Sequence, residues 1–239
     1  MLYLIGLGLN IDGISKYGLE LVKRCKRVYL EDYTVDFPYS AGELQEILGK
    51  KLILANREKV ESLELVDEAK KIDVALLVYG SPLTATTHIS LIEEAKKMKI
   101  NYQILYNASV FDAVAETGLQ LYKFGKIASM PAWDKKKNFT PDSFMKIVTE
   151  NMSIKAHSLI LVDIGLDIKY SLKQLQISAK NHNIKLKKLI ICQRLGAKYK
   201  RILYKTIEEL KEYNNIKKPY CIIIPSKLHF VEKEFLEGI

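Results

Sequence analysis

The feature that most constrains this chain is a short apolar run that stops at a glycine and a proline. Residues 74–78 (Val-Ala-Leu-Leu-Val) are apolar throughout, which is typical of a buried strand, and Gly80-Ser81-Pro82 follows them. The spacing of residues 89–98 then predicts a helix. A strand that ends this way exposes backbone at the carboxyl end of a sheet, where open α/β sheets bind ligands. The local residues alone favour a plainer interpretation, a strand-to-helix turn with a threonine cap.

Strand and helix alternate in this way through the whole first half, which favours a parallel sheet. The second half repeats short apolar runs, with a helix start predicted at Thr140 and Pro141 and a capping box at Thr206 and Glu209. We predict two domains, residues 1–126 and 127–239. The predicted strands are 2–5, 27–31, 51–54, 74–78, 101–106, 158–163, 188–195, 202–205 and 220–225, and the predicted helices are 14–26, 41–48, 60–71, 89–98, 171–180 and 206–213.

Composition limits the class of protein. With 239 residues, 48% of them hydrophobic, the chain can bury a sizeable core. No apolar run reaches the roughly 18 residues that span a membrane, and no cleavable leader precedes the first strand, so we expect a cytoplasmic protein. The cysteines, Cys25, Cys192 and Cys221, are isolated from one another. They predict buried thiols and neither a disulfide framework nor a metal site.

The net charge of +9 is unevenly distributed along the chain. Residues 1–125 hold 15 Lys and Arg against 17 Asp and Glu, a net charge of −2, and residues 126–239 hold 22 against 11, a net charge of +11. A basic second half is expected to meet an acidic partner, either nucleic acid or an acidic protein surface. A lysine-rich, solvated surface with no partner explains the same count equally well.

The sequence offers little side-chain chemistry of its own. It has no nucleophile elbow, no phosphate-binding Walker loop and no His-Glu-x-x-His, and its four histidines lack the spacing of metal ligands. The turn at Gly6 and Gly8, with Glu31 ending the next strand, resembles a dinucleotide fingerprint, but Ile11 replaces the third glycine. A nicotinamide cofactor is therefore disfavoured. Turns at strand ends remain, and such sites suit reactions in which a cofactor carries the reactivity.

Taken together, several short motifs over nearly the whole chain resemble the diphthine synthase family, within the tetrapyrrole methylase superfamily. Each motif is weak alone, whereas Ala-Thr-Thr-His and Tyr-Lys-Phe-Gly make the set specific. The motifs are Leu4-Ile5-Gly6-Leu7-Gly8-Leu9, Glu31-x-Tyr33-Thr34, Arg57-Glu58-x-Val60-Glu61, Gly80-x-Pro82-Leu83-x-Ala85-Thr86-Thr87-His88, Ala108-Ser109, Thr117-Gly118-Leu119-x-x-Tyr122-Lys123-Phe124-Gly125 and Lys227-Leu228-His229.

The resemblance implies two α/β domains of the tetrapyrrole methylase type. The N-terminal sheet would be mostly parallel and the C-terminal sheet mixed, with S-adenosylmethionine in the cleft between the domains. It also implies a cytoplasmic homodimer that repeatedly methylates the amino group of a 3-amino-3-carboxypropyl-histidine on translation elongation factor 2, releasing S-adenosylhomocysteine. This reaction forms diphthine in diphthamide biosynthesis and requires neither a membrane nor nucleic acid. The basic second half would then dock the protein substrate.

The resemblance also implies which residues contact the cofactor. Two of them depart from the family pattern, since Ser81 stands where aspartate is usual and Tyr220 where histidine is usual. No catalytic base is implied, and His88 and Tyr33 are candidates by position alone. The implied cofactor-binding residues are Leu9, Ser81, Thr84, Ser109, Val110, Val162, Leu195 and Tyr220.

Two alternatives stay open. One is another methyltransferase of the same fold, acting on a corrinoid, a porphyrin or ribosomal RNA. The other is a non-catalytic binding protein that kept the fold, which the serine at position 81 makes conceivable. Binding of S-adenosylmethionine separates the second alternative from an enzyme.

Overall fold

The computed structural model describes residues 1–213 and 215–239, which divide into two compact units. The first unit comprises Met1–Phe111 with Gly196–Lys198, and the second comprises Asp112–Leu195 with Tyr199–Ile239. The domain boundary expected between residues 126 and 127 stays a prediction. It lies between the last strand of the first sheet and the first strand of the second.

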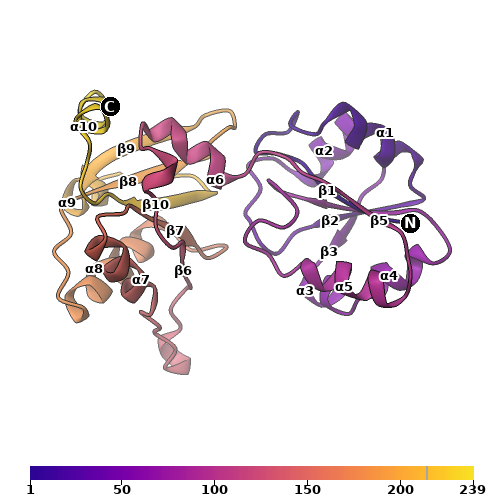
Figure 1. The fold of residues 1–239 in the computed structure, drawn as a ribbon, viewed down its shortest axis with the longest axis horizontal. Helices are drawn as coiled ribbons and strands as arrows, with labels where there is room; N and C mark the ends of the chain where they lie inside the picture. Colours follow the sequence, from indigo (N-terminus) through magenta and orange to yellow (C-terminus); the bar gives the residue numbers. More distant parts are fainter. Residues whose placement is uncertain (214) are drawn as a thin grey trace. The chain divides into compact units, whose positions relative to one another are not determined.

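The first unit is built on a five-stranded sheet with helices on both faces (Figure 1). Its strands lie in the order β3-β2-β4-β1-β5, and every pairing is parallel, which confirms the parallel sheet predicted from the alternation. The central strand β4 is the apolar run from which the sequence analysis began, and all five of its residues are buried. The strands are β1 (Leu2–Gly6), β2 (Arg27–Glu31), β3 (Ile53–Ala55), β4 (Val74–Val78) and β5 (Tyr102–Leu105).

Successive strand residues face opposite sides of this sheet, and each side has its own core. Leu2, Leu4 and Leu76 pack against α3 (Arg57–Glu61), α4 (Glu64–Ala69) and α5 (Ile89–Lys97). Ile5 and Leu77 pack against α1 (Lys16–Arg24) and α2 (Ala41–Leu48) on the other side. A strand apolar on both faces needs this double cover, which explains the unbroken apolar run.

The single helix predicted over residues 60–71 is wrong, because two short helices, α3 and α4, occupy this segment. Asn56 caps α3 before the predicted start, accepting a hydrogen bond from the Lys59 amide at 2.9 Å. Leu63 then takes a left-handed conformation with φ of 63° between the two helices. Neither Pro nor Gly marks this break, so residue type gave no signal of it.

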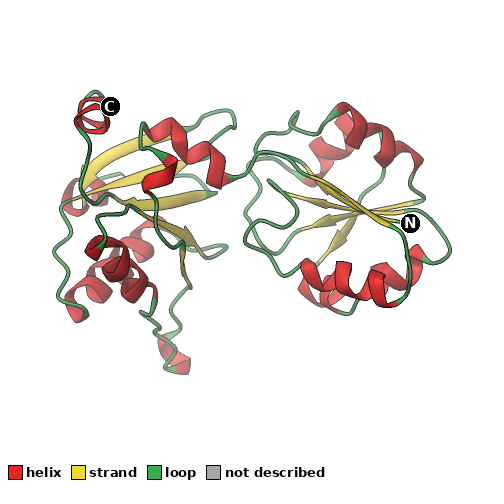
Figure 2. Ribbon diagram, in the orientation of Figure 1, coloured by secondary structure: helices red, strands yellow, loops and turns green. Residues whose placement is uncertain are grey.

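The second unit also holds a five-stranded sheet, in the order β6-β7-β10-β8-β9 (Figure 1). Figure 2 shows the strands of this sheet in yellow and the helices beside it in red. Among the described strands of this sheet, only β6 and β7 pair in parallel and the other pairings are antiparallel, so the sheet is mixed, as the resemblance implied. Because β10 lies between β7 and β8, the strand nearest the C-terminus is central. The strands are β6 (Ala128–Met130), β7 (Ser158–Val162), β8 (Lys188–Gln193), β9 (Arg201–Thr206) and β10 (Tyr220–Ile224).

One face of this second sheet packs against three helices. These are α7 (Phe144–Ser153), α8 (Ile168–Asn181) and α9 (Ile207–Lys211), which share a core with Ile222 and Ile224 of β10. The remaining helical segments are α6 (Val110–Ala113), α10 (Phe230–Glu237) and the 3₁₀ turns η1 (Val114–Thr117), η2 (Leu121–Lys123) and η3 (Lys135–Lys137).

The two helix starts predicted in this unit differ in outcome. The capping box of Thr206 and Glu209 is confirmed at the start of α9. The start predicted at Thr140 and Pro141 is wrong, because α7 begins at Phe144. The carbonyl of Pro141 instead accepts the indole hydrogen bond of Trp133 at 2.9 Å, which holds this segment against the preceding loop.

The three cysteines are free and buried, as predicted. Cys192 and Cys221 lie opposite each other on β8 and β10, and their hydrogen bond together with burial raises the pKa of Cys192. Within residues 1–213 and 215–239, no helix combines the length and the apolar character needed to cross a membrane.

Candidate functional site

The carboxyl ends of β1 and β4 are joined by two glycines in the first unit. The amide of Gly8 donates to the carbonyl of Gly80 at 3.1 Å, and the amide of Gly80 donates to the carbonyl of Gly8 at 2.9 Å. Both glycines are left-handed, with φ of 70° and 72°. Residues with a β-carbon enter this region at an energetic cost, so glycine suits both turns.

A third glycine lets these turns approach each other closely. A β-carbon on Gly6 would lie 2.6 Å from the carbonyl oxygen of Gly80 and 2.9 Å from the β-carbon of Asn107. Asn107 follows β5, and its side-chain amide donates to the carbonyls of Gly6 at 3.0 Å and Gly13 at 2.8 Å. The loops after β1 and β5 are therefore held together by one side chain. The sequence predicted a strand over residues 101–106 directly before Asn107, but did not predict this role.

Five of the predicted cofactor-binding residues follow these strand ends in the first unit. The Ser81 side chain is buried, and among the residues that the structure describes its hydroxyl makes no hydrogen bond. The Ser109 hydroxyl accepts a hydrogen bond from the Phe111 amide at 3.2 Å, so Ser109 caps the first turn of α6. The five residues are Leu9 after β1, Ser81 and Thr84 after β4, and Ser109 and Val110 after β5.

His88 holds the loop after β4 in place. Its ring is fully buried, with Nδ1 2.9 Å from the carbonyl oxygen of Pro82 and Nε2 3.4 Å from the Tyr33 hydroxyl. A carbonyl can only accept, so Nδ1 carries the proton and Nε2 is left to accept from Tyr33. Burial lowers the pKa of His88, which keeps the ring neutral. This geometry supports a positioning role for His88 and gives no evidence of a base.

Glu31, the carboxylate that contributes to the resemblance to a dinucleotide fingerprint, is fully buried at the end of β2. It accepts hydrogen bonds from the Thr34 hydroxyl at 2.8 Å and from the Tyr33 amide at 3.2 Å. Burial raises the pKa of Glu31, although these donors oppose the shift. The carboxylate therefore fixes the loop that follows it, which removes the feature on which the dinucleotide comparison rested.

The other three predicted cofactor-binding residues lie at the same end of the strands of the second sheet. Cys221 pairs with Leu161, so Tyr220 and Val162 lie together one residue further along β10 and β7. Tyr220 also pairs with Gln193 of β8, two residues before Leu195. The hydroxyl of Tyr220 donates to the carbonyl of Leu166 at 3.1 Å. The tyrosine thus ties the start of β10 to the loop after β7.

The two sheet edges offer hydroxyls, main-chain amides and main-chain carbonyls. Over the described part of the chain, no three His, Cys, Asp or Glu side chains come together as a metal site. The eight predicted cofactor-binding residues are aliphatic, hydroxyl-bearing or aromatic. None of them is a histidine, cysteine, lysine or carboxylate that could act as a base. Residues of this kind can bind and orient a reactive molecule, with little side-chain chemistry of their own.

Known proteins of one kind match this chain. The model of the tetrapyrrole (corrin/porphyrin) methylases matches residues 1–211. A diphthine synthase from Methanocaldococcus jannaschii is 34% identical, with the alignment covering 99% of this chain and 98% of that protein. A diphthine methyl ester synthase from Schizosaccharomyces pombe is 45% identical over 69% of this chain and 58% of its own length, so this match spans less than two thirds of that relative.

A solved structure of a diphthine synthase superposes with a TM-score of 0.89 at 30% sequence identity. The superposition covers 99% of this chain and 94% of the other. The alignment to the Methanocaldococcus jannaschii protein and this superposition thus each cover 99% of the chain.

Proposed function

The chain belongs to the diphthine synthase family of the tetrapyrrole methylases, and from this premise we propose that it is a methyltransferase dependent on S-adenosylmethionine. Its acceptor is the amino group of a 3-amino-3-carboxypropyl-histidine on translation elongation factor 2, methylated repeatedly to form diphthine. The observation that supports this most is the pair of sheet edges that present the eight implied cofactor-binding residues.

The residues present fit such a cofactor. Ser81 is a mostly buried residue whose hydroxyl has no partner among the described residues, so this hydroxyl is available to a ligand. A β-carbon on Gly80 would have only ordinary contacts, at 3.7 Å from the backbone of Ala108 and Ser109, so these neighbours leave room for a methyl group. The proposed cofactor-binding residues are Leu9, Ser81, Thr84, Ser109, Val110, Val162, Leu195 and Tyr220.

When bound, S-adenosylmethionine supplies a methyl group activated by a sulfonium. The chain's contribution is placement: the strand-end carbonyls and the hydroxyls of Ser81 and Thr84 orient the donor relative to the acceptor. The acceptor amine must be neutral to act as a nucleophile, so a pocket that disfavours its charged form assists the reaction. His88 and Tyr33 hold the loop that carries Ser81 and Thr84.

The acceptor lies on a protein, and the basic second half, with its net charge of +11, supports docking of an acidic protein surface. This leads us to expect that methyl transfer weakens as ionic strength rises. A cytoplasmic location and a homodimer remain parts of the proposal that follow from the family alone.

Mass spectrometry of the elongation factor tests this function directly. We expect the peptide carrying the modified histidine to gain mass in methyl steps, only when both the chain and S-adenosylmethionine are present. A factor with an unmodified histidine is the control and should not change. Since some relatives are named methyl ester synthases, mild base should be used to distinguish ester methyls, which it removes, from amine methyls.

Two results would overturn the proposal. Methylation of a porphyrin, a corrinoid or ribosomal RNA in place of the factor would indicate another member of the same fold. Tight binding of S-adenosylmethionine without transfer to any of these acceptors would indicate a non-catalytic protein.

A further inference from the structure

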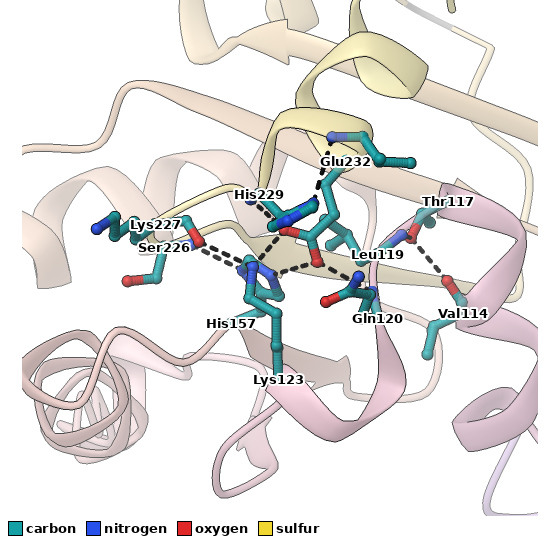
Figure 3. A network of polar contacts seen from close by, with 11 residues as sticks. Val114, Thr117, Leu119, Gln120, Lys123, His157, Ser226, Lys227, His229 and Glu232 are labelled. Atoms are coloured by element: carbon teal, nitrogen blue, oxygen red, sulfur yellow. Dashed lines mark hydrogen bonds and ion pairs between the residues drawn. The ribbon is translucent and has the colours of Figure 1, made fainter.

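Two sequence motifs that the proposed cofactor site does not use meet in the second unit. They are Tyr122-Lys123-Phe124-Gly125, around η2, and Lys227-Leu228-His229, just before α10. The Lys123 ammonium donates to the carbonyl of Lys227 at 3.0 Å and also forms an ion pair with Glu232 (Figure 3). Residues about a hundred positions apart therefore form one local surface.

Glu232 is the centre of this arrangement and is fully buried. Its carboxylate accepts hydrogen bonds from the amides of His229 at 2.7 Å and Gln120 at 3.0 Å, in addition to Lys123 (Figure 3). Burial disfavours the ionised carboxylate, but these donors outweigh it and lower the pKa of Glu232 to about 2. The network thus fixes η2 and the start of α10 to each other.

His157 also stabilises this surface through hydrogen bonds. Its Nδ1 accepts from the Ser226 amide at 3.0 Å, so Nε2 carries the proton and donates to Glu232 at 3.3 Å. The backbone of His157 also exchanges hydrogen bonds with Lys123 and Gly125. Both motifs are therefore anchored to the strand that begins at Ser158.

A pocket of about 500 Å³ opens on this anchored surface. Residues 122–124, 154–156 and 227–229 line it, and they include three lysines and no carboxylate. Glu232 neutralises Lys123, whereas Lys155 and Lys227 are exposed and their ammonium groups have no partner among the described residues. Two uncompensated cations therefore stand beside the pocket.

The rest of the pocket is apolar or aromatic. Phe124, Ala156 and Leu228 contribute to its lining, and Tyr122 and Ile154 are 82% and 71% exposed. Phe230, whose ring contacts that of His229 at a centroid distance of 4.2 Å, is 73% exposed. Large exposed aromatic and aliphatic side chains gathered at one place are typical of a protein-binding surface.

We propose that this pocket docks an acidic segment of the protein substrate, with an apolar side chain of that segment inserted between Tyr122 and Ile154. The inference rests on the proposed function and adds the surface that recognises the substrate apart from the reacting histidine. Lys155 and Lys227 pair with carboxylates of the segment. Nucleic acid fits less well, because two free cations give few phosphate contacts and the lining is largely apolar.

Binding of the chain to translation elongation factor 2 tests the docking surface with paired variants. The double variant Lys155→Glu with Lys227→Glu reverses the charge at the two unpaired lysines of the pocket. The control is Lys185→Glu with Lys187→Glu, which makes the same change at exposed lysines elsewhere in the second unit. We expect the first pair to weaken binding about tenfold or more and to reduce its salt dependence, and the control pair to stay within about twofold. Tyr122→Ala should weaken binding, and Tyr170→Ala, which also removes an exposed tyrosine, should not.

Equal losses in both lysine pairs, or no loss in either, would overturn the docking surface. A change in oligomeric state caused by Lys155→Glu with Lys227→Glu would overturn it in favour of a contact between copies of this chain. Competition by a single-stranded RNA would overturn it in favour of nucleic acid. Methyl transfer by the unaltered chain tests the proposed function separately, so transfer that persists at full rate in the pocket variants contradicts the docking surface alone.

Discussion

Gly8 and Gly80 exchange two backbone hydrogen bonds, of 3.1 and 2.9 Å, across the ends of β1 and β4. The bridge is antiparallel although the strands that lead into it are parallel. Both chains must therefore turn sharply just past the sheet, which explains the positive φ at each glycine. The turns leave Leu9 and Ser81, two of the implied cofactor-binding residues, beside the bridge.

Gly80→Ala should weaken binding of S-adenosylmethionine. The new methyl group has room, but φ of 72° strains alanine by about 1–2 kcal/mol and shifts the turn that carries Ser81. Gly49→Ala is the matched control, since Gly49 has φ of 59°, open space for a β-carbon and a position at the end of α2. Calorimetry should find the loss of affinity in Gly80→Ala only, while both variants lose similar thermal stability. Equal affinity in the two variants would contradict the role of the turn.

Ser81→Asp should strengthen binding of S-adenosylmethionine by about tenfold, because a carboxylate near a cationic ligand adds a charge-assisted contact of about 1.5–3 kcal/mol, part of which is lost to burial. In the control Ser81→Asn, the asparagine is nearly the same size as aspartate but carries no charge, so this variant should not strengthen binding. S-adenosylhomocysteine lacks the sulfonium charge, so its affinity should rise less. If Ser81→Asn gains as much as Ser81→Asp, charge is not the missing element at this position.

His88→Asn should reduce stability and leave the pH dependence of methyl transfer unchanged. The asparagine amide can keep the hydrogen bond to Pro82 but loses the contact with Tyr33 and much of the ring's packing, which costs about 2 kcal/mol. Denaturant unfolding measures the first effect, and the pH profile of kcat/KM measures the second. Loss of an ascending limb from that profile in His88→Asn would show that the ring acts as a base.

Glu232→Gln should destabilise the second unit in a pH-dependent way. Since the pKa of Glu232 falls from its ordinary 4.5 to about 2 on folding, the ionised carboxylate stabilises the folded state above pH 4.5, by about 3 kcal/mol. That contribution disappears as the pH falls from about 4.5 to about 2. The difference in free energy of unfolding between the unaltered chain and Glu232→Gln should therefore be constant near neutral pH and shrink in acid.

Glu209→Gln provides the control for this prediction. Glu209 completes the capping box of α9 as Glu232 completes that of α10, but Glu209 is exposed and forms no ion pair with a lysine among the residues that the structure describes. Its replacement should have a much smaller effect than that of Glu232. Equal losses from the two substitutions would show that capping, and not the buried network, accounts for the stability.

Most strands could be predicted from the sequence because buried strands carry a strong local signal. The run 74–78 is an example, since its strand is covered on both faces and admits only apolar residues. The break at Leu63 could not be predicted, because a left-handed leucine is imposed by packing and has no signature in residue type. The start of α7 was missed for a similar reason, since the Trp133 contact that holds Pro141 outside the helix is made by the loop before it.

In the candidate site too, features with a local signal could be predicted and features that depend on distant residues could not. The turns at Gly6, Gly8 and Gly80 are visible in the sequence because glycine is needed for their conformation or close approach. The tie made by Asn107 and the network around Glu232 were not visible, since they join residues about a hundred positions apart. For Asn107 the signal was an asparagine directly after a strand. For Glu232 there was no local signal, because His229 stands where the capping-box pattern has serine or threonine, whereas Thr206 precedes Glu209.

Calorimetric titration with S-adenosylmethionine and S-adenosylhomocysteine tests the central claim most directly, because every step of the proposed reaction depends on a methyl-donor site. The account predicts micromolar binding of at least one of the two ligands, with weaker binding in Gly80→Ala and unchanged binding in Gly49→Ala. Absence of binding at millimolar concentrations of both ligands would contradict it and would leave a protein that shares the fold of the family without its reaction.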